Sequence, residues 1–225
     1  MLLSRLRKVL RQAADPVKAP IMQAYMKSEM PYHGVPMPRL RQICKVAFVD
    51  VEFATAPEWY GQVLDLWRAA QYLEERYAAL YLTRDKRALR YQTPSAMKLY
   101  EELIVTGAWW DYVDEIAANR VGPILRDYPA PMRRKMLSWS SSADLWKRRT
   151  AILCQLGSKA HTDLALLYAC IEPSLGSQEF FLRKAIGWSL RQYAWTDAAE
   201  VKRYVRRNRD RLSALSVREA LKNIA

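Results

Sequence analysis

The stretch WWDYVDEIAA, residues 109–118, carries apolar residues at helical spacing and predicts a helix, as do most segments of the chain. Positions four apart share one face of a helix, so Trp110 and Asp114 project side by side while Tyr112 turns to the far side. The spacing therefore predicts a surface that carries an indole and a carboxylate. Both groups attract a cation, so this surface suits a positive centre.

A structural interpretation of the same stretch stays open. The two tryptophans could pack in the core, with Asp111 or Asp114 at the positive end of the helix, where acidic side chains are favoured. Carboxylates that are aimed at a ligand are a minority of all carboxylates. The hexapeptide at 109–114 alone does not decide between the two interpretations.

The rest of the chain is also predicted to be helical. Only seven glycines and eleven prolines interrupt it, and no pair of strands with a hairpin turn stands out. Proline follows Thr93 and Ala56 in two first turns, Gly107 marks a helix end, and Ser140 to Ser142 supply N-cap hydroxyls before Asp144. The predicted helices are 3–13, 20–29, 37–49, 57–69, 71–83, 94–105, 109–127, 130–138, 142–156, 160–171, 176–193, 197–208 and 215–224.

Helices of these lengths joined by short turns pack as antiparallel hairpins. Hairpins stacked in sequence form an α-solenoid, whose curvature leaves a concave groove. No linker divides the chain and no crisp sequence repeat is visible. We therefore expect an all-α protein with one domain that spans residues 1–225.

The charge balance points to an anionic partner. The chain has 36 Lys and Arg against 23 Asp and Glu, a formal net charge of +13. Nucleic acid is a more common partner of such a protein than a membrane surface. Three basic groups are separated by acidic sequence and are expected to form one surface of the groove: the nine Lys and Arg of residues 1–45; Arg133, Arg134, Lys135, Lys147, Arg148 and Arg149; and Lys202, Arg203, Arg206, Arg207, Arg209 and Arg211.

Cysteine and histidine usage predicts neither a metal site nor a cofactor. Cys44, Cys154 and Cys170 lack metal-ligand spacing and are odd in number, so they are expected to be reduced and packed as small apolar groups. His33 and His161 are too few for a catalytic triad or a metal cluster. No apolar run reaches the length of a membrane span, and residues 1–7 lack the apolar core of a signal peptide. We expect a cytoplasmic protein that does not engage a membrane.

Two further helices bear on the surface at 109–118. One is predicted to turn Arg148 or Arg149 outward or into the groove. The other places Phe181, Lys184, Trp188, Arg191 and Gln192 on one flank at spacings of three and four. For each helix alone, core packing of the tryptophan and solvent exposure of the arginine are the commoner outcomes.

A glycine also lies inside the second of these helices. Gly187 costs up to about 1 kcal/mol relative to alanine, so something is expected to approach the backbone there. A neighbouring helix and a bound ligand both explain it.

Five segments together resemble a known family. They are AYMKSEMPYHGV at 24–35, WWDYVD at 109–114, LWKRRTAIL at 145–153, FFLRKAIGWSLRQYA at 180–194 and LSVREALKNI at 215–224. In this order and spacing they resemble the AlkD-like DNA alkylation repair proteins, which are DNA glycosylases built from HEAT-like repeats. The resemblance extends over nearly the whole chain, and the first segment is its weakest part.

The resemblance implies a role for particular residues. Asp114 is implied as the catalytic carboxylate, with Trp110 and Trp188 against the sugar-phosphate at the lesion. Arg149 is implied to hold the DNA backbone, and Tyr25 to complete an aromatic cleft. Arg148, Lys184 and Arg191, on the segments that match, are expected to bind DNA as well.

The implied activity is removal of N3- and N7-alkylated purines, such as 3-methyladenine and 7-methylguanine, from double-stranded DNA. It is implied to proceed without base flipping, with Asp114 stabilising an oxocarbenium-like sugar and orienting water. No lysine is an evident Schiff-base nucleophile, so we expect a monofunctional enzyme that acts as a monomer. Two alternatives stay open: a HEAT-like module that binds damaged or branched DNA without catalysis, and a solenoid that binds an acidic protein.

Overall fold

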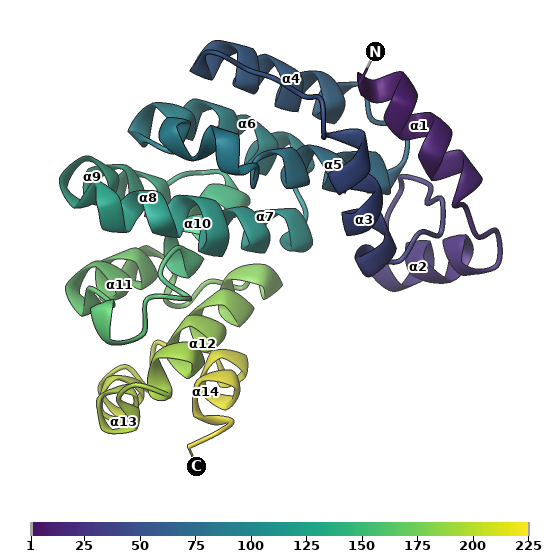
Figure 1. Cartoon of the computed structure of the whole chain (residues 1–225). Coiled ribbons are helices and arrows are strands. Elements are labelled where there is room, and N and C mark those ends of the chain that lie inside the picture. Colours follow the sequence, from purple (N-terminus) through teal and green to yellow (C-terminus); the bar gives the residue numbers. More distant parts are fainter. Residues whose placement is uncertain (1, 225) are drawn as a thin grey trace. The chain divides into compact units, whose positions relative to one another are not determined.

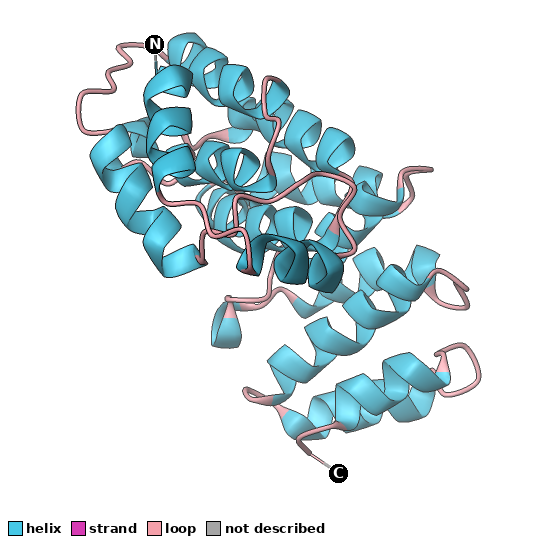
Figure 2. Cartoon of the chain, turned by 90° about the vertical axis from the view of Figure 1, so that its right-hand side faces the viewer, coloured by secondary structure: helices cyan, strands magenta, loops and turns pink. Residues whose placement is uncertain are grey.

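The computed structural model describes residues 2–224. Within this range the chain forms fourteen α-helices, a few short 3-10 segments and one π-helical turn, joined by loops and without a strand (Figure 1, Figure 2). The prediction of an all-α protein is confirmed. Among these helices none is long and apolar enough to cross a bilayer.

The chain divides into two compact units, Met1–Tyr91 and Gln92–Ala225. The single-domain assignment stays a prediction. In the first unit α4 packs against α5, and α3 packs against both α1 and α5. Its elements are α1 (Leu2–Gln12), α2 (Lys18–Met26), α3 (Met37–Ala47), α4 (Ala56–Arg68), α5 (Leu73–Leu82) and the 3-10 segment Lys86–Tyr91.

A buried carboxylate fixes a loop of the first unit. Glu74 is 0% exposed and accepts hydrogen bonds from the backbone N–H groups of His33, Gly34 and Val35 at 2.9–3.0 Å. These bonds satisfy a buried charge that is otherwise costly. The segment 33–35, which belongs to the first of the five segments quoted above, is thus held by α5.

The second unit contains the remaining nine α-helices of the described chain. Within it, α12 packs against α10, α13 and α14, and α9 packs against α10 and α11 (Figure 1). The helices are α6 (Met97–Gly107), α7 (Trp110–Ile116), α8 (Gly122–Asp127), α9 (Pro129–Ser140), α10 (Leu145–Leu153), α11 (Leu164–Ile171), α12 (Phe180–Ala194), α13 (Ala198–Arg207) and α14 (Ala214–Leu221).

The helix predicted over 109–127 is interrupted. A π-helical turn, Ala117–Val121, separates α7 from α8. The backbone just after this turn is crowded, because a Cβ atom on Gly122 would lie 2.5 Å from the carbonyl oxygen of Cys154. A glycine is therefore required where the chain passes the end of α10.

Capping groups explain several helix ends. Thr55 caps α4 by accepting from the N–H of Glu58. Helix α10 starts at Leu145, so its cap is Asp144, which accepts from the N–H groups of Trp146 and Lys147. The expectation that serine hydroxyls cap this helix is wrong, because the nearest one, that of Ser142, instead accepts from the N–H of Asp144.

The three cysteines are free and buried. Burial raises the pKa of Cys44 and of Cys170 to about 12 and raises that of Cys154 as well. These thiols stay protonated at neutral pH and act as small apolar groups, as predicted.

Candidate active site

A pocket of about 290 Å³ lies in the second unit, where α7, α10, α12 and α14 meet. It is enclosed mainly by aromatic and charged side chains. The lining residues are Trp110, Asp114, Arg149, Phe180, Phe181, Lys184, Trp188, Arg191 and Glu219. Most of the residues predicted to form a site are thus brought together from three segments that are far apart in the sequence.

The α7 wall follows from helical spacing. Trp110 and Asp114, one turn apart, both line the pocket, and Tyr112 is buried on the far side. The adjacent Trp109 instead packs against Trp146 and Phe181, with ring centroids 6.4 and 5.6 Å away. Both tryptophans are half-buried, but Trp109 packs against other aromatic rings and Trp110 lines the pocket.

Arg149 binds the Asp114 carboxylate with two parallel hydrogen bonds. Its Nε donates to Oδ1 at 2.7 Å and its Nη2 to Oδ2 at 2.8 Å. A third bond runs from Nη1 to the carbonyl oxygen of Phe181 at 2.5 Å. The side chains are only 5% and 12% exposed, so Asp114 is held in one orientation on the pocket wall.

Burial raises the pKa of Asp114, and the Arg149 guanidinium offsets part of this effect. The carboxylate is therefore a better proton acceptor than an exposed aspartate, and it depends on the arginine for its charge. An ionised Asp114 in a site lined by indoles can stabilise a positive charge that develops nearby.

The α12 wall also follows from helical spacing. Phe181, Lys184, Trp188 and Arg191 recur every three or four residues and all line the pocket. Trp188 packs in addition against the buried apolar cluster formed by α10 to α14. Core packing and a place in the pocket are not exclusive for this side chain.

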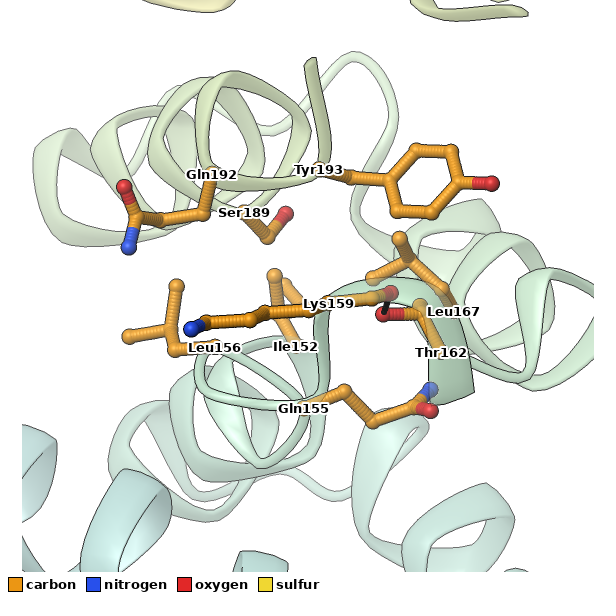
Figure 3. Close-up of a pocket in the computed structure, with 9 residues that line it drawn as sticks. All are labelled: Ile152, Gln155, Leu156, Lys159, Thr162, Leu167, Ser189, Gln192 and Tyr193. Carbon is orange, nitrogen blue, oxygen red and sulfur yellow. Dashed lines mark hydrogen bonds between the residues drawn. The ribbon is translucent and has the colours of Figure 1, made fainter. Parts of the chain in front are cut away.

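Gln192 does not belong to this wall, contrary to expectation. With Ser189 and Tyr193 it lines a different cavity of about 10 Å³, which Figure 3 shows between α12 and the end of α10. A cavity of this size holds at most about one water molecule. Gln192 lies one residue beyond Arg191, and that step of about 100° turns its side chain away from the pocket.

Glu219 is one of two pocket residues that were not predicted from the sequence. It is on α14 and accepts from Lys184 Nζ at 3.0 Å and from Arg191 Nη1 at 2.7 Å. These cations lower its pKa, with the Lys184 hydrogen bond as the largest cause. Glu219 lies within the quoted segment 215–224, but nothing in its spacing marks it as a neighbour of α12.

The rim of the pocket holds a second residue that was not predicted. Phe180 is 52% exposed and packs edge-on against Phe181, with ring centroids 5.4 Å apart. Phe181 in turn lies 5.7 Å from the Arg149 guanidinium and 5.0 Å from the Trp146 ring. The double aromatic FF at the start of α12 was the available signal.

Two predicted residues lie elsewhere. Arg148 is not among the lining residues, because its guanidinium donates to the Ser174 hydroxyl at 3.0 Å and to the Pro173 carbonyl. Tyr25 lies in the first unit, on α2, with 80% of its surface exposed. DNA binding by Arg148 and a place for Tyr25 in the cleft both stay predictions.

The close approach at Gly187 is explained by a helix. A Cβ atom there would lie 2.5 Å from Cβ of Glu219 and 2.8 Å from the carbonyl oxygen of Ser216. The glycine thus lets α14 pack directly on α12. This contact brings Glu219 to the edge of the pocket.

Comparison with known proteins gives a consistent result. The family described as DNA alkylation repair enzyme matches residues 6–224. The fold is similar to that of a solved structure from Enterococcus faecalis, described as a predicted DNA alkylation repair enzyme, with a TM-score of 0.85 and 26% sequence identity over 94% of this chain and 97% of that one. No curated protein gives a significant match.

Proposed function

Because the chain belongs to the DNA alkylation repair enzyme family, we propose that it is a monofunctional DNA glycosylase. Its substrates are cationic N3- and N7-alkylated purines in duplex DNA, such as 3-methyladenine and 7-methylguanine. The main support is the position of Asp114, which is held by Arg149 on the wall of a pocket that also contains Trp110 and Trp188.

The reaction needs little acid catalysis. The C1′–N bond breaks with its electron pair going to the purine, and this neutralises the positive charge of the alkylated base. Water then adds to C1′ and loses a proton, which leaves an abasic site and a free base. The difficult species is the oxocarbenium-like sugar, whose positive charge has to be stabilised away from bulk water.

Asp114 supplies that stabilisation. A fixed carboxylate in a site poor in water contributes on the order of 3 kcal/mol to the transition state. Burial raises the pKa of Asp114, so the side chain can also accept the proton of the attacking water. In place of the contact with the DNA backbone that the resemblance implies, we propose that Arg149 acts through Asp114, since three of its five N–H groups are used to hold the carboxylate and the carbonyl of Phe181.

The two tryptophans complete the cationic site. Trp110 and Trp188 come from different helices and line the same pocket as Asp114. Their π faces attract the sugar cation, each contributing roughly 0.5–2 kcal/mol, and their bulk excludes water. Trp188 is anchored by its packing against the core, so its ring is fixed before the substrate arrives.

DNA is bound by its backbone in this proposal. The helical hairpins stack as HEAT-like repeats, and the net charge of +13 provides a basic groove for the phosphates. Lys184 and Arg191 contact phosphates near the lesion, and Arg148 and Tyr25 also bind DNA. Selection rests on the lability of the cationic nucleotide, so the base need not be flipped into the protein.

A non-catalytic module for damaged or branched DNA is the second candidate. The observation in its favour is that Arg149 already occupies both oxygens of Asp114. In this candidate, the ion pair of Asp114 with Arg149 only stabilises the fold and has no catalytic role. Activity measurements separate the two candidates.

The experiment is incubation of the protein with duplex DNA that carries 7-methylguanine at one position. Released base and abasic sites are measured by chromatography and by alkaline strand cleavage. We expect that the amount of free base equals the amount of abasic sites, and that the strand is not cleaved before alkali is added. Tight binding without release of base would support the non-catalytic module.

A further inference from the structure

We propose that Glu219 is a positioning residue that holds Lys184 and Arg191 as a preformed phosphate clamp beside Trp188 and offsets one of their two charges. The inference deepens the proposed function and rests on it for the identity of the ligand, a DNA phosphate. Glu219 itself does not contact the reacting atoms.

The geometry supports a clamp. The Glu219 carboxylate receives Lys184 on Oε1 at 3.0 Å and Arg191 on Oε2 at 2.7 Å, so one oxygen is assigned to each cation. Its side chain is 12% exposed, whereas those of Lys184 and Arg191 are 39% and 21% exposed. The carboxylate is therefore the inner member, and the two cations keep a surface that a phosphate can reach.

The backbone is built to bring this carboxylate close. Gly187 lies on α12 between Lys184 and Arg191, and its missing side chain leaves room for Cβ of Glu219. The contact is reinforced because the Ser216 hydroxyl, one turn earlier on α14, donates to the carbonyl oxygen of Arg183 at 2.9 Å. The glycine and the hydrogen bond thus both fix α14 beside Lys184 and Arg191.

The charges explain why such a clamp is useful. Lys and Arg side chains are flexible, and ordering them when a phosphate binds costs conformational entropy. Glu219 orders both before binding. Its negative charge also leaves Glu219, Lys184 and Arg191 with a net charge of +1. This lower charge weakens binding to the backbone of undamaged DNA and so favours binding at sites where Trp188 contributes as well.

The test compares Glu219→Gln with the wild-type protein in two measurements. The first is the dependence of affinity on salt for undamaged duplex DNA, and the second is the single-turnover rate of base release from 7-methylguanine DNA. In Glu219→Gln, the plot of log affinity against log salt concentration should become steeper by about 1, because one more cation is free to bind phosphate. The rate should fall roughly 10-fold, because the cations are no longer fixed.

Two controls make the test specific. Asp65→Asn makes the same change in net charge on the exposed face of α4 and should alter neither quantity. Glu219→Gln made in a protein that already carries Lys184→Gln and Arg191→Gln should not change the salt slope further. Glu219→Asp keeps the charge but shortens the side chain, so it should keep the wild-type slope and lose part of the rate.

An unchanged slope and rate in Glu219→Gln would overturn the inference. It would also be overturned if Asp65→Asn steepened the salt slope equally. The same holds if Glu219→Gln still steepened the slope in the protein that carries Lys184→Gln and Arg191→Gln. If the wild-type protein releases no base but the slope changes as expected, the clamp stands and the glycosylase proposal fails.

Discussion

The Arg149 guanidinium binds both oxygens of the Asp114 carboxylate, at 2.7 and 2.8 Å, on the wall of a pocket rather than within the core. Removing one partner of such a buried pair is costly, because the other is left as an unpaired charge. The pair therefore couples the ionisation of Asp114 to the presence of Arg149.

Arg149→Gln should move the acidic limb of the pH–rate profile to higher pH. Burial raises the pKa of Asp114 and Arg149 partly offsets it, so without the guanidinium the pKa rises further. Because the ionised carboxylate is the active form, the rate then falls at a higher pH as the solution is acidified. Single-turnover rates measured between acidic and neutral pH test this, with Arg149→Lys as the variant that keeps a positive charge.

The same substitution should destabilise the fold by about 3 kcal/mol near neutral pH. The sign of its pH dependence follows from the raised pKa of Asp114. Protonation relieves the unpaired charge, so the loss should shrink as the pH falls through the pKa that Asp114 has in the folded variant. Chemical denaturation at several pH values measures this; a loss that is independent of pH would contradict the coupling.

Trp109→Ala should mainly lower stability and Trp110→Ala should mainly lower activity, although the residues are adjacent. Trp109 packs against Trp146 and Phe181, so its loss should lower the free energy of unfolding by roughly 2–3 kcal/mol. Trp110 lines the pocket, so its loss should reduce the rate of base release roughly 10-fold with a smaller effect on stability. Thermal melts and single-turnover rates on both variants decide this, and similar effects of the two would remove Trp110 from the site.

Gly187→Ala should destabilise the protein by about 1–3 kcal/mol, because the new methyl group would lie 2.5 Å from Cβ of Glu219. The matched control is Gly61→Ala, which is also inside a helix but where, apart from the adjoining residues and the backbone of that helix, nothing lies within 4 Å of the added Cβ. That change should stabilise α4 by about 0.5–1 kcal/mol. Equal effects on the unfolding midpoint would contradict the close approach of α14.

Helical periodicity predicted most of the side chains that single helices contribute to the site, with Gln192 as the exception. Trp110 and Asp114 on α7, and Lys184, Trp188 and Arg191 on α12, face one pocket as their spacing predicts. Local rules work here because helix geometry fixes which side chains share a face.

Contacts between helices were beyond this reasoning. Glu219 reaches the pocket only because α14 packs on α12, and the sequence signalled an approach at Gly187 without naming its partner. The ion pair that holds Arg149 likewise depends on how α10 packs against α7. The π-helical turn at Ala117–Val121 is followed directly by Gly122 and Pro123, and this local signal was overlooked when one continuous helix was predicted over 109–127.

The most direct test of the account is the rate of base release by Asp114→Asn, measured with its affinity for the same 7-methylguanine duplex. Asparagine keeps the size of the side chain but removes the negative charge. We predict that the single-turnover rate falls by about 100-fold or more while DNA is still bound. A variant that binds and releases base at the wild-type rate would contradict the assignment of Asp114 as the group that stabilises the sugar cation.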